Sequence, residues 1–479
     1  MDFNSAELLH FNGLIKMVWP ETKRDIKTFY RQMVLTHTFV LLLVLILSSS
    51  LVQGQLPVIT PGIAKTADKT SDPDEPSDLK TEANRWTSFL GNHRNGISDE
   101  TGLNLNWNVH KPAVLWRVPL GGGYSSMVIA EGRLWTMATH LTKDFVVCFD
   151  ARSGKKLWTT EAAPTYIDHQ KQASGPRSTP TYHAGKLYCL LPAGDLLCLN
   201  AKSGKVLWKV NIFQISGAPR QEEQTLYYWG MSASPLIEGD LVILQPGGNN
   251  NNSVIAINKD TGKLVWGAGN DPPGYGSPIV IDTLDQRQII VPTGSSILSL
   301  NPAEGSLLWR IVWGNKYNCN CATPVWNDES LFISSAYGTG CMRFALFRQN
   351  EEIRPISQWK SLSLQNQFAT SMINDGYIYG PHGDLAAVTY RCLDMQRGKI
   401  QWQTRRVGKC TQIAAEGHLI CLTEQGTLIL VEANPTEYRE KGKLTGLLSF
   451  KAWAHPALAN RRLYLRDEKR LICLDLQKK

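Results

Sequence analysis

The 479-residue sequence lacks most of the short motifs that mark enzymes. It contains no Gly-x-Ser-x-Gly, the turn that carries the nucleophile of many hydrolases, and no His-Glu-x-x-His, the zinc site of many metalloproteases. It also contains neither a Cys-x-x-Cys motif nor the Cys-x-x-Cys-His motif that attaches a c-type haem. Because these motifs are absent, the sequence predicts no catalytic residue.

The sequence also lacks any block of like charge. Its formal net charge of +8 is modest for its length, and Lys and Arg are scattered among acidic residues. A nucleic-acid partner is therefore not predicted. The hydrophobic content of 43%, with 15 Trp and 39 Gly, instead predicts a globular protein with a large core and many tight turns.

An apolar run over residues 39–52 follows a basic stretch, and this order is typical of export signals. Cleavage after Gly54 would remove it, and the alternative is an uncleaved membrane anchor, although the run is shorter than the ~20 residues that span a bilayer. We predict that residues 1–54 are a signal peptide or N-terminal anchor. The protein is then exported to the periplasm or cell envelope, or secreted, and it associates with a membrane only if this segment is uncleaved.

Residues 55–84 are rich in Pro, Asp, Lys, Thr and Ser, with hardly any large apolar side chains in their later part. This composition predicts a disordered linker between the export segment and a folded domain over 85–479. A translation start at Met17 or Met33 would give the export signal a more usual length.

One phrase recurs along the folded domain and predicts a repeat architecture. It consists of a small residue, an apolar residue, Asp or Asn, a turn ending in Gly-Lys, and a Trp. Its copies end at Trp158, Trp208, Trp266 and Trp309, with a divergent copy ending at Trp402 and one without its Gly at Trp359.

A second marker, a Ser or Thr that often precedes Pro, opens an alternating apolar stretch upstream of each copy. Its clear cases are Thr179-Pro180, Ser234-Pro235, Ser277-Pro278 and Thr323-Pro324, and its looser versions are Ser125-Ser126, Thr370-Ser371, Cys410-Thr411 and His455-Pro456. Eight units result. Between the markers, short apolar stretches flank turn residues in the pattern of hairpins.

Each unit thus predicts four short antiparallel strands, and a single four-stranded sheet cannot cover both its faces. Arranged radially, each sheet covers the next, so we predict an all-β, eight-bladed β-propeller of four-stranded antiparallel blades. The last unit ends without a Trp strand. The apolar stretch 113–118, which precedes the first full unit, has the character to complete it, so an N-terminal strand closes the last blade.

Four of the ten cysteines occupy one column of the repeat, which other units fill with Ala256 or Ser299. These four are Cys148, Cys198, Cys392 and Cys473. We interpret them as small buried side chains. A cross-strand disulfide between Cys189 and Cys198 stays open as an alternative. Cys319 and Cys321 lack a nearby His cluster that would indicate a metal site.

The phrase Asp/Asn-x-x-Ser/Thr-Gly-Lys-x-Leu/Val-Trp resembles the repeat of pyrroloquinoline quinone dehydrogenases and of the non-catalytic propeller BamB, which serves outer-membrane protein assembly. The resemblance covers about residues 85–479. The stretch 86–98, with Trp107 after it, is also similar to exported quinoprotein-like propeller proteins that are frequent in planctomycetes.

The quinone dehydrogenases carry an adjacent Cys-Cys disulfide against the cofactor, a calcium or lanthanide site and an Asp base. This sequence has no adjacent Cys-Cys pair. We therefore expect no cofactor, and pyrroloquinoline quinone with calcium only if the chain is a dehydrogenase with a divergent site. The sequence also departs from BamB, because no Cys for a lipid anchor follows the apolar run.

Propellers bind ligands at the end of the axis where loops lead into the innermost strands, so residues just before each marker are the candidate binding surface. The candidates are Tyr124, Arg177, Tyr228, Trp229, Tyr275, Asn318 and Asn366. Arg177 and Trp229 pair a cation with an aromatic ring, which suits an acidic or sugar-like group. An inter-blade contact is the simpler interpretation of each residue taken alone.

The sequence thus predicts a monomeric propeller that acts as a binding or scaffold module for a protein or envelope component. A quinone-dependent alcohol or sugar dehydrogenase and a carbohydrate-binding propeller are the alternatives.

Overall fold

The computed structural model describes residues 85–167, 175–218, 229–384, 388–449 and 451–478. The predicted export segment and linker, residues 1–84, lie outside the described residues. None of the helical segments within the described ranges has the length and apolar character of a membrane span.

The described residues form eight antiparallel sheets of four strands, and this confirms the predicted all-β propeller. We number each blade by its innermost strand. The innermost strands of blades 1 to 8 are β3 (Val128–Ala130), β7 (Thr181–His183), β11 (Leu236–Glu238), β15 (Ile279–Thr283), β19 (Val325–Asn327), β23 (Met372–Asn374), β27 (Cys410–Ala415) and β31 (Ala457–Ala459). The second strands are β4 (Arg133–His140), β8 (Lys186–Leu190), β12 (Leu241–Leu244), β16 (Gln286–Pro292), β20 (Ser330–Ser335), β24 (Tyr377–His382), β28 (His418–Thr423) and β32 (Arg462–Arg466).

The two outer strands of each blade follow the same order. The third strands are β5 (Lys143–Asp150), β9 (Asp195–Asn200), β13 (Val254–Asn258), β17 (Ser296–Leu300), β21 (Gly340–Gln349), β25 (Thr389–Asp394), β29 (Leu428–Glu432) and β33 (Arg470–Asp475). The fourth strands are β6 (Lys156–Pro164), β10 (Val206–Asn211), β14 (Leu264–Ala268), β18 (Leu307–Val312), β22 (Glu352–Ser361), β26 (Ile400–Thr404), β30 (Arg439–Leu444) and β2 (Val114–Pro119). The short helix α3 (Ile212–Ser216) follows blade 2.

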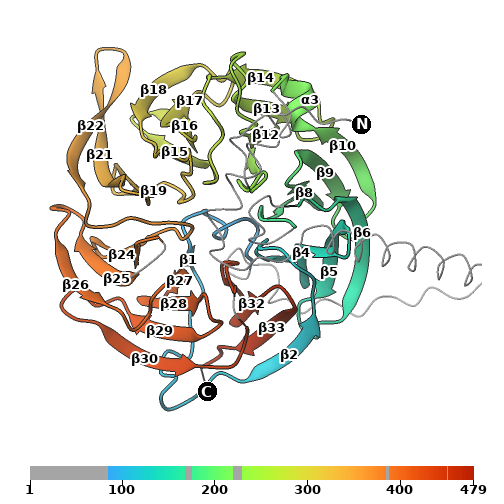
Figure 1. Cartoon of the computed structure of the whole chain (residues 1–479), viewed down its shortest axis with the longest axis vertical. Helices are drawn as coiled ribbons and strands as arrows, with labels where there is room; N and C mark the ends of the chain where they lie inside the picture. Colours follow the sequence, from blue (N-terminus) through green and yellow to red (C-terminus); the bar gives the residue numbers. More distant parts are fainter. Residues whose placement is uncertain (1–84, 168–174, 219–228, 385–387, 450, 479) are drawn as a thin grey trace, which may run out of the picture. The chain divides into compact units, whose positions relative to one another are not determined.

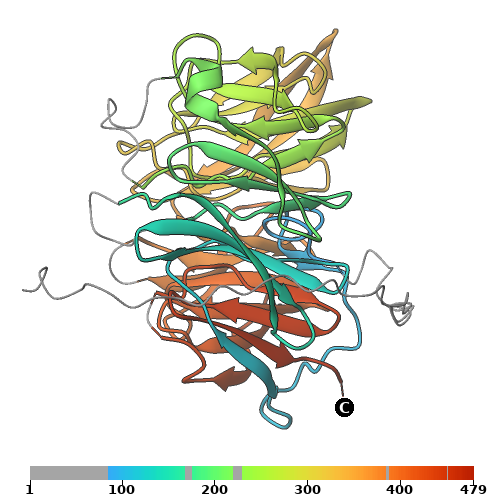
Figure 2. The ribbon, with the colours of Figure 1, turned by 90° about the vertical axis from the view of Figure 1, so that its right-hand side faces the viewer.

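The ring closes as predicted, because β2 is the outer strand of the last blade and pairs with β33 (Figures 1 and 2). All strands of the eight blades and the cores between them are built from residues after Arg85. The part of the chain from Arg85 onward is therefore a complete folding unit with its own cores.

The repeated Trp of one blade packs against the repeated Gly in the turn of the next blade. Trp116 lies on the turn of blade 1, where a Cβ on Gly154 would come 2.7 Å from the Trp116 ring and where the backbone has a φ of +73°. The indole nitrogen of Trp116 donates to the carbonyl of Ala151 in the same turn, at 3.2 Å. The same packing joins Trp158 to Gly204, Trp208 to Gly262, Trp266 to Gly305 and Trp359 to Gly398. Only Gly fits there, because the turn needs both positive φ and an open face.

The repeat column of cysteines is buried, as predicted. Cys198 pairs across the blade with Trp208 on one side and Tyr188 on the other, where only a small side chain leaves room for both rings. The alternative of a Cys189–Cys198 disulfide is wrong. Cys189 pairs with Leu197, so the two cysteines point to opposite faces of the sheet, and both are free thiols.

Blade 7 lacks the repeated Trp, and a Trp from elsewhere in the chain takes its place. Gly442 stands at the Trp position of β30, and a Cβ there would come 2.4 Å from the Cβ of Trp107. Trp107 lies before β2, is buried in the core that also holds Leu428 and Leu430, and its indole nitrogen donates to the carbonyl of Asn104.

The first described residues cross one end of the axis and act as a plug. Trp86 pairs with Ile129 at the end of β3, and β1 (Ile97–Ser98) pairs in parallel with β27 of blade 7. Between them, the buried guanidinium of Arg94 donates hydrogen bonds to the backbone carbonyls of Ser234, Pro235 and Pro278. The plug thereby ties blades 1, 3, 4 and 7 together.

The propeller therefore has two distinct faces. The plug face carries the hairpins between first and second strands and the turns between third and fourth strands, which bond to each other, as in the bond from Ala151 N to Gly132 O. The opposite side, which we call the marker face, carries the segments that lead into the innermost strands. There Tyr124 N donates to Pro176 O of the next blade.

Candidate functional site

The predicted markers link neighbouring blades around the axis. The backbone N–H of Ser126 donates to the Thr179 hydroxyl at 3.1 Å, and the N–H of Thr179 donates to the Ser234 hydroxyl at 2.9 Å. The same bond continues from Ser234 to Ser277, from Ser277 to Thr323 and from Thr323 to Thr370. In blades 2 to 6, the hydroxyl at this position accepts the bond that joins the blade to the previous one.

The residue of each marker at the position of Thr179 is Ser126 in blade 1, Thr411 in blade 7 and His455 in blade 8. Two residues before this position, one side chain per blade lies on the marker face. This rim ring consists of Tyr124, Arg177, Ser232, Tyr275, Cys321, Phe368, Lys409 and Trp453. All except the buried Tyr124 are half-buried, whereas the markers themselves are buried. The rim-ring side chains are therefore less buried than the markers that bond the blades together.

One part of the rim ring is an aromatic stack between blades 8, 1 and 2. The ring centroids of Tyr124 and Trp453 are 4.8 Å apart, and the guanidinium carbon of Arg177 lies 5.1 Å from the Tyr124 centroid. The Tyr124 hydroxyl donates to the carboxylate of Glu468 at 3.1 Å. Such a cation over an aromatic ring is typical of surfaces that bind partners.

Blades 6, 7 and 8 contribute a second cluster that shares Trp453. The Phe368 and Trp453 ring centroids are 5.3 Å apart, and the ammonium of Lys409 lies 5.0 Å and 5.2 Å from them, respectively. Glu424 accepts a hydrogen bond from the Trp453 indole and forms an ion pair with Lys409 at 3.4 Å. The aromatic rings therefore enclose a cation that the chain itself supplies.

Blades 3, 4 and 5 contribute a third group. The Trp229 and Tyr275 rings meet edge to face at 5.5 Å, and the thiols of Cys319 and Cys321 lie 3.4 Å apart nearby. Burial, and then the two thiols, raise the pKa of Tyr275 well above its usual value, while Arg177 lowers it. The charge of Arg177 also opposes the rise in the pKa of Cys321, so a cation of blade 2 affects side chains of blades 4 and 5.

The structure separates the predicted site residues into two sets. Tyr124, Arg177, Trp229 and Tyr275 lie on the marker face in the contacts described above. Asn318 and Asn366 do not belong to the rim ring. Tyr228 lies outside the described residues.

Both asparagines have local structural contacts. Asn366 is buried, donates to the carbonyl of Pro381 and accepts from the Ser371 hydroxyl. Asn318 sits in a turn with a φ of +51°, where its Cβ approaches Gly294. The hydrogen bonds of Asn366 and the positive φ of Asn318 account for asparagine at these two positions. Both side chains therefore have a structural role.

Sequence reasoning missed five members of the rim ring: Ser232, Cys321, Phe368, Lys409 and Trp453. The signal was present, because each stands two residues before its marker, as Tyr124 and Arg177 do. The looser markers of blades 6, 7 and 8 hid this register for Phe368, Lys409 and Trp453.

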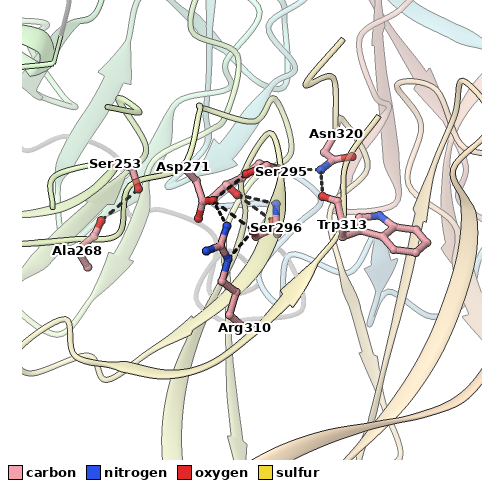
Figure 3. Close-up of polar contacts among 9 residues, drawn as sticks. Ser253, Ala268, Asp271, Ser295, Ser296, Arg310, Trp313 and Asn320 are labelled. Atoms are coloured by element: carbon pink, nitrogen blue, oxygen red, sulfur yellow. Dashed lines mark hydrogen bonds and ion pairs between the residues drawn. The ribbon is translucent and has the colours of Figure 1, made fainter. Parts of the chain in front are cut away.

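A polar network supports the marker face between blades 3 and 4 (Figure 3). The buried carboxylate of Asp271 accepts hydrogen bonds from Ser295 at 2.7 Å, from Ser296 at 3.2 Å and from Arg310 at 2.6 Å. Close by, the Asn320 amide donates to the carbonyl of Trp313 at 2.8 Å. Because three donors of its own chain hold Asp271, its carboxylate fixes the loop before blade 4.

The side chains present do not fit a calcium-quinone centre of the kind that the resemblance implies. Within the described ranges, no three His, Cys, Asp or Glu side chains are arranged to hold a metal ion. Cys319 and Cys321 are separated by one residue, and the carboxylate of Glu424, next to the axis, is already bonded to Lys409 and Trp453. No step of a mechanism is therefore derived through such a centre.

The known proteins that this chain resembles include both an assembly factor and a dehydrogenase. A family model described as outer membrane protein assembly factor BamB matches residues 100–212 and 142–404. Polyvinylalcohol dehydrogenase of Pseudomonas sp is 28% identical over 234 residues, 36% of this chain and 34% of that protein. The outer membrane protein assembly factor BamB of Moranella endobia (strain PCIT) is 22% identical over 264 residues, 52% of this chain and 63% of that protein. The chain thus spans only part of either relative.

A solved structure shares the fold. The quinohemoprotein alcohol dehydrogenase of Comamonas testosteroni superposes with a TM-score of 0.59 at 13% identity, over 84% of this chain and 82% of that one. At this identity the likeness concerns the propeller alone.

Proposed function

Because the chain belongs to the family described as outer membrane protein assembly factor BamB, we propose that it is an exported, non-catalytic propeller that binds a protein partner on its marker face. The rim ring carries this proposal. Tyr124, Arg177, Phe368 and Trp453 are of the residue types that dominate protein interfaces, and they meet near the axis from four blades.

The geometry favours binding over chemistry at this site. The carboxylates beside the rim ring, Glu424 and Glu468, are engaged with Lys409, Trp453 and Tyr124. The half-buried members of the ring include the aromatic side chains Phe368 and Trp453 and the cation Arg177. This combination suits an acidic or aromatic side chain of a partner, inserted along the axis. Export is proposed from the apolar run 39–52.

The test is site-specific photo-crosslinking of the full chain in cells that express it. A benzophenone amino acid replaces Phe368 on the rim ring or, as the control, the exposed Ile356 on the outer strand of blade 5. We expect a defined protein adduct from the Phe368 position only. The same adducts from both positions, or none from either, would contradict the proposal.

A direct measurement follows once the adduct is identified. The purified partner should bind the unchanged chain and lose about 2 kcal/mol of binding free energy on Trp453→Ala, which is a usual loss for an aromatic hot spot. Ile356→Ala should leave the affinity unchanged. Equal affinities for all three chains would place the partner elsewhere.

A dehydrogenase is the second candidate, favoured by the likeness to polyvinylalcohol dehydrogenase. Incubation of the purified chain with pyrroloquinoline quinone and calcium, followed by gel filtration and an absorbance scan, separates the two. Retained quinone together with dye-linked oxidation of alcohols or sugars would establish the enzyme. Binding of glycans at the rim ring, lost in Trp453→Ala, would instead establish a carbohydrate-binding propeller.

A further inference from the structure

The outer strands of blades 1 to 3 carry an exposed apolar residue at the same place. In each of these strands the residue before the repeated Trp is a β-bulge, because the pairing register shifts by one residue there. The bulged residues are Leu157, Leu207 and Val265, and they are 40%, 46% and 50% exposed. Val206 and Leu264, directly before two of them, are also exposed.

Basic residues surround these bulges. The turn that leads into each bulge ends in Gly-Lys and holds further cations. The exposed cations are Arg152, Lys155 and Lys156 in blade 1, Lys202 and Lys205 in blade 2, and Lys263 in blade 3. Among the described residues, none of these six forms an ion pair with a carboxylate. The acids nearby are largely engaged, since Asp260 pairs with Lys186 and Asp240 with Lys259.

Blades 4 to 7 differ at the same positions. The bulged residue is Gln358 in blade 5, Gln401 in blade 6 and Lys441 in blade 7. The turn of blade 4 carries Glu304, and that of blade 5 carries Glu351 with Glu352. Blade 8, next to blade 1, repeats the pattern with the bulged Leu115 beside Val114, 42% and 41% exposed, and with the exposed Lys111. Within the described ranges, exposed Leu or Val together with cations outside ion pairs therefore occurs in the sector of blades 8 and 1 to 3.

This sector lies on the plug face, where the described chain begins. The turns of blades 1 to 3 bond to the neighbouring hairpins of that face, as in the bond from Ala201 N to Gly185 O. Trp86 bonds to Ile129 on the same face, so the described chain begins there.

From these observations we propose that the plug-face edge of blades 1 to 3, which we call the basic edge, docks on a membrane surface that contains anionic lipids. The turns share one face, so a flat surface reaches all three at once. The lysines meet lipid phosphates, while the bulged side chains enter the boundary between head groups and acyl chains. This docking would turn the marker face away from the membrane and leave it open to a partner.

The test uses the chain from Arg85 onward, which forms the complete ring and lacks the apolar run that could bind lipid by itself. Sedimentation with vesicles measures the bound fraction, using phosphatidylcholine alone or with phosphatidylglycerol added at about three parts in ten, enough to give the surface a negative potential. We expect binding only to the vesicles with phosphatidylglycerol, and weaker binding as salt rises.

Three variants separate the contributions. The apolar variant combines Leu157→Gln, Leu207→Gln and Val265→Gln, and the charge variant combines Lys155→Gln, Lys205→Gln and Lys263→Gln. Each should lower the partition coefficient by at least about tenfold, because each basic or apolar contact contributes on the order of a fewfold. The control combines Arg397→Gln, Lys399→Gln and Ile400→Gln in the corresponding turn and outer strand of blade 6 and should bind like the unchanged chain.

Three outcomes would overturn the proposal: no dependence on phosphatidylglycerol, equal losses in the control, or an apolar variant that binds normally. A dimer seen by sedimentation velocity and abolished in the apolar variant, without vesicle binding, would assign the basic edge to a second copy of the chain instead. None of these outcomes bears on the marker face, so the partner proposed there is tested separately.

Discussion

Trp116 on the first long strand of the propeller lies directly opposite Cys473 on the last one. This pairing closes the ring, and it gives blade 8 the same Trp and small-residue contact that blades 1 to 4 and blade 6 form within one stretch of chain. The start of the folded domain is thus as much a part of the last blade as the end of the chain is. Its two ends are held together, so fraying of either strand would open the ring.

Arg466 should be a main support of this closure. Its buried guanidinium donates to the carbonyls of Gly121, Gly123, Ser125 and Met137, which joins blade 8 to blade 1. Arg466→Met leaves these carbonyls without a donor, and we expect a loss of about 3–5 kcal/mol in the free energy of unfolding. Urea denaturation followed by fluorescence measures it.

The exposed Arg354 provides the matched control for this change. It pairs only with Glu352 on the same strand, and Arg354→Met should cost less than about 0.5 kcal/mol. If both variants unfolded at the same urea concentration, Arg466 would not be a support of the closure.

Gly154 and Gly185 have nearly the same φ but different surroundings. Substituting each one separates the cost of a steric clash from the cost of backbone strain. Gly154 has a φ of +73° and faces Trp116, whereas Gly185 has a φ of +76° and no heavy atom within 4 Å of the position that a Cβ would take. Gly185→Ala should cost about 1–2 kcal/mol from the backbone alone. Gly154→Ala should cost about 2–4 kcal/mol, because it also pushes against the indole. Thermal unfolding of both variants measures these costs. Equal costs would show that the Trp116 side chain moves aside without loss of stability.

His455 makes stability depend on pH. Burial lowers the pKa of His455 from 6.5 to about 3, so the folded protein keeps the imidazole neutral while the unfolded chain takes up a proton below about pH 6.5. This contribution is fully present above pH 6.5 and is lost as pH falls toward 3. Between pH 7.5 and pH 5, the loss should be about 2 kcal/mol.

Replacement isolates this effect. The difference in unfolding free energy between His455→Gln and the unchanged chain should shift by about 2 kcal/mol in favour of the variant as pH falls from 7.5 to 5. The exposed His93 serves as the control, because His93→Gln should produce no comparable shift. A pH profile of His455→Gln parallel to that of the unchanged chain would exclude this role of His455.

The sequence was most informative where the same residue recurs at the same place. The Trp and Gly of the turns and the small residues opposite Trp predicted the blades, and the missing last strand predicted the closure. Contacts made once could not be predicted this way. Arg94 looks like any other arginine of an N-terminal stretch, yet the structure places it across the axis on three carbonyls.

The candidate site was half predictable for the same reason. Arg177 stands before a marker with Pro, whose register the repeat made clear, whereas Phe368 and Lys409 stand before markers without Pro, and their register was not recognised. The contact between Phe368 and Trp453 joins blades 6 and 8, and no local pattern encodes a contact across the axis.

Trp107 and Gly442 offer the most specific test of how the repeat is completed. Trp107→Ala removes a buried indole from the core against blade 7 and should cost about 3–5 kcal/mol. Gly442→Trp alone should also destabilise, because its side chain must enter space that Trp107 fills. Combined, the two changes place a Trp at the regular repeat position and remove the one that blocks it. The double variant should lose less stability than the sum of the two single losses, because the clash with Trp107 is gone while the strain of a side chain at a φ of +147° remains. Urea denaturation of the four chains gives the coupling energy, and simple addition of the two losses would show that Trp107 does not replace the missing repeat residue.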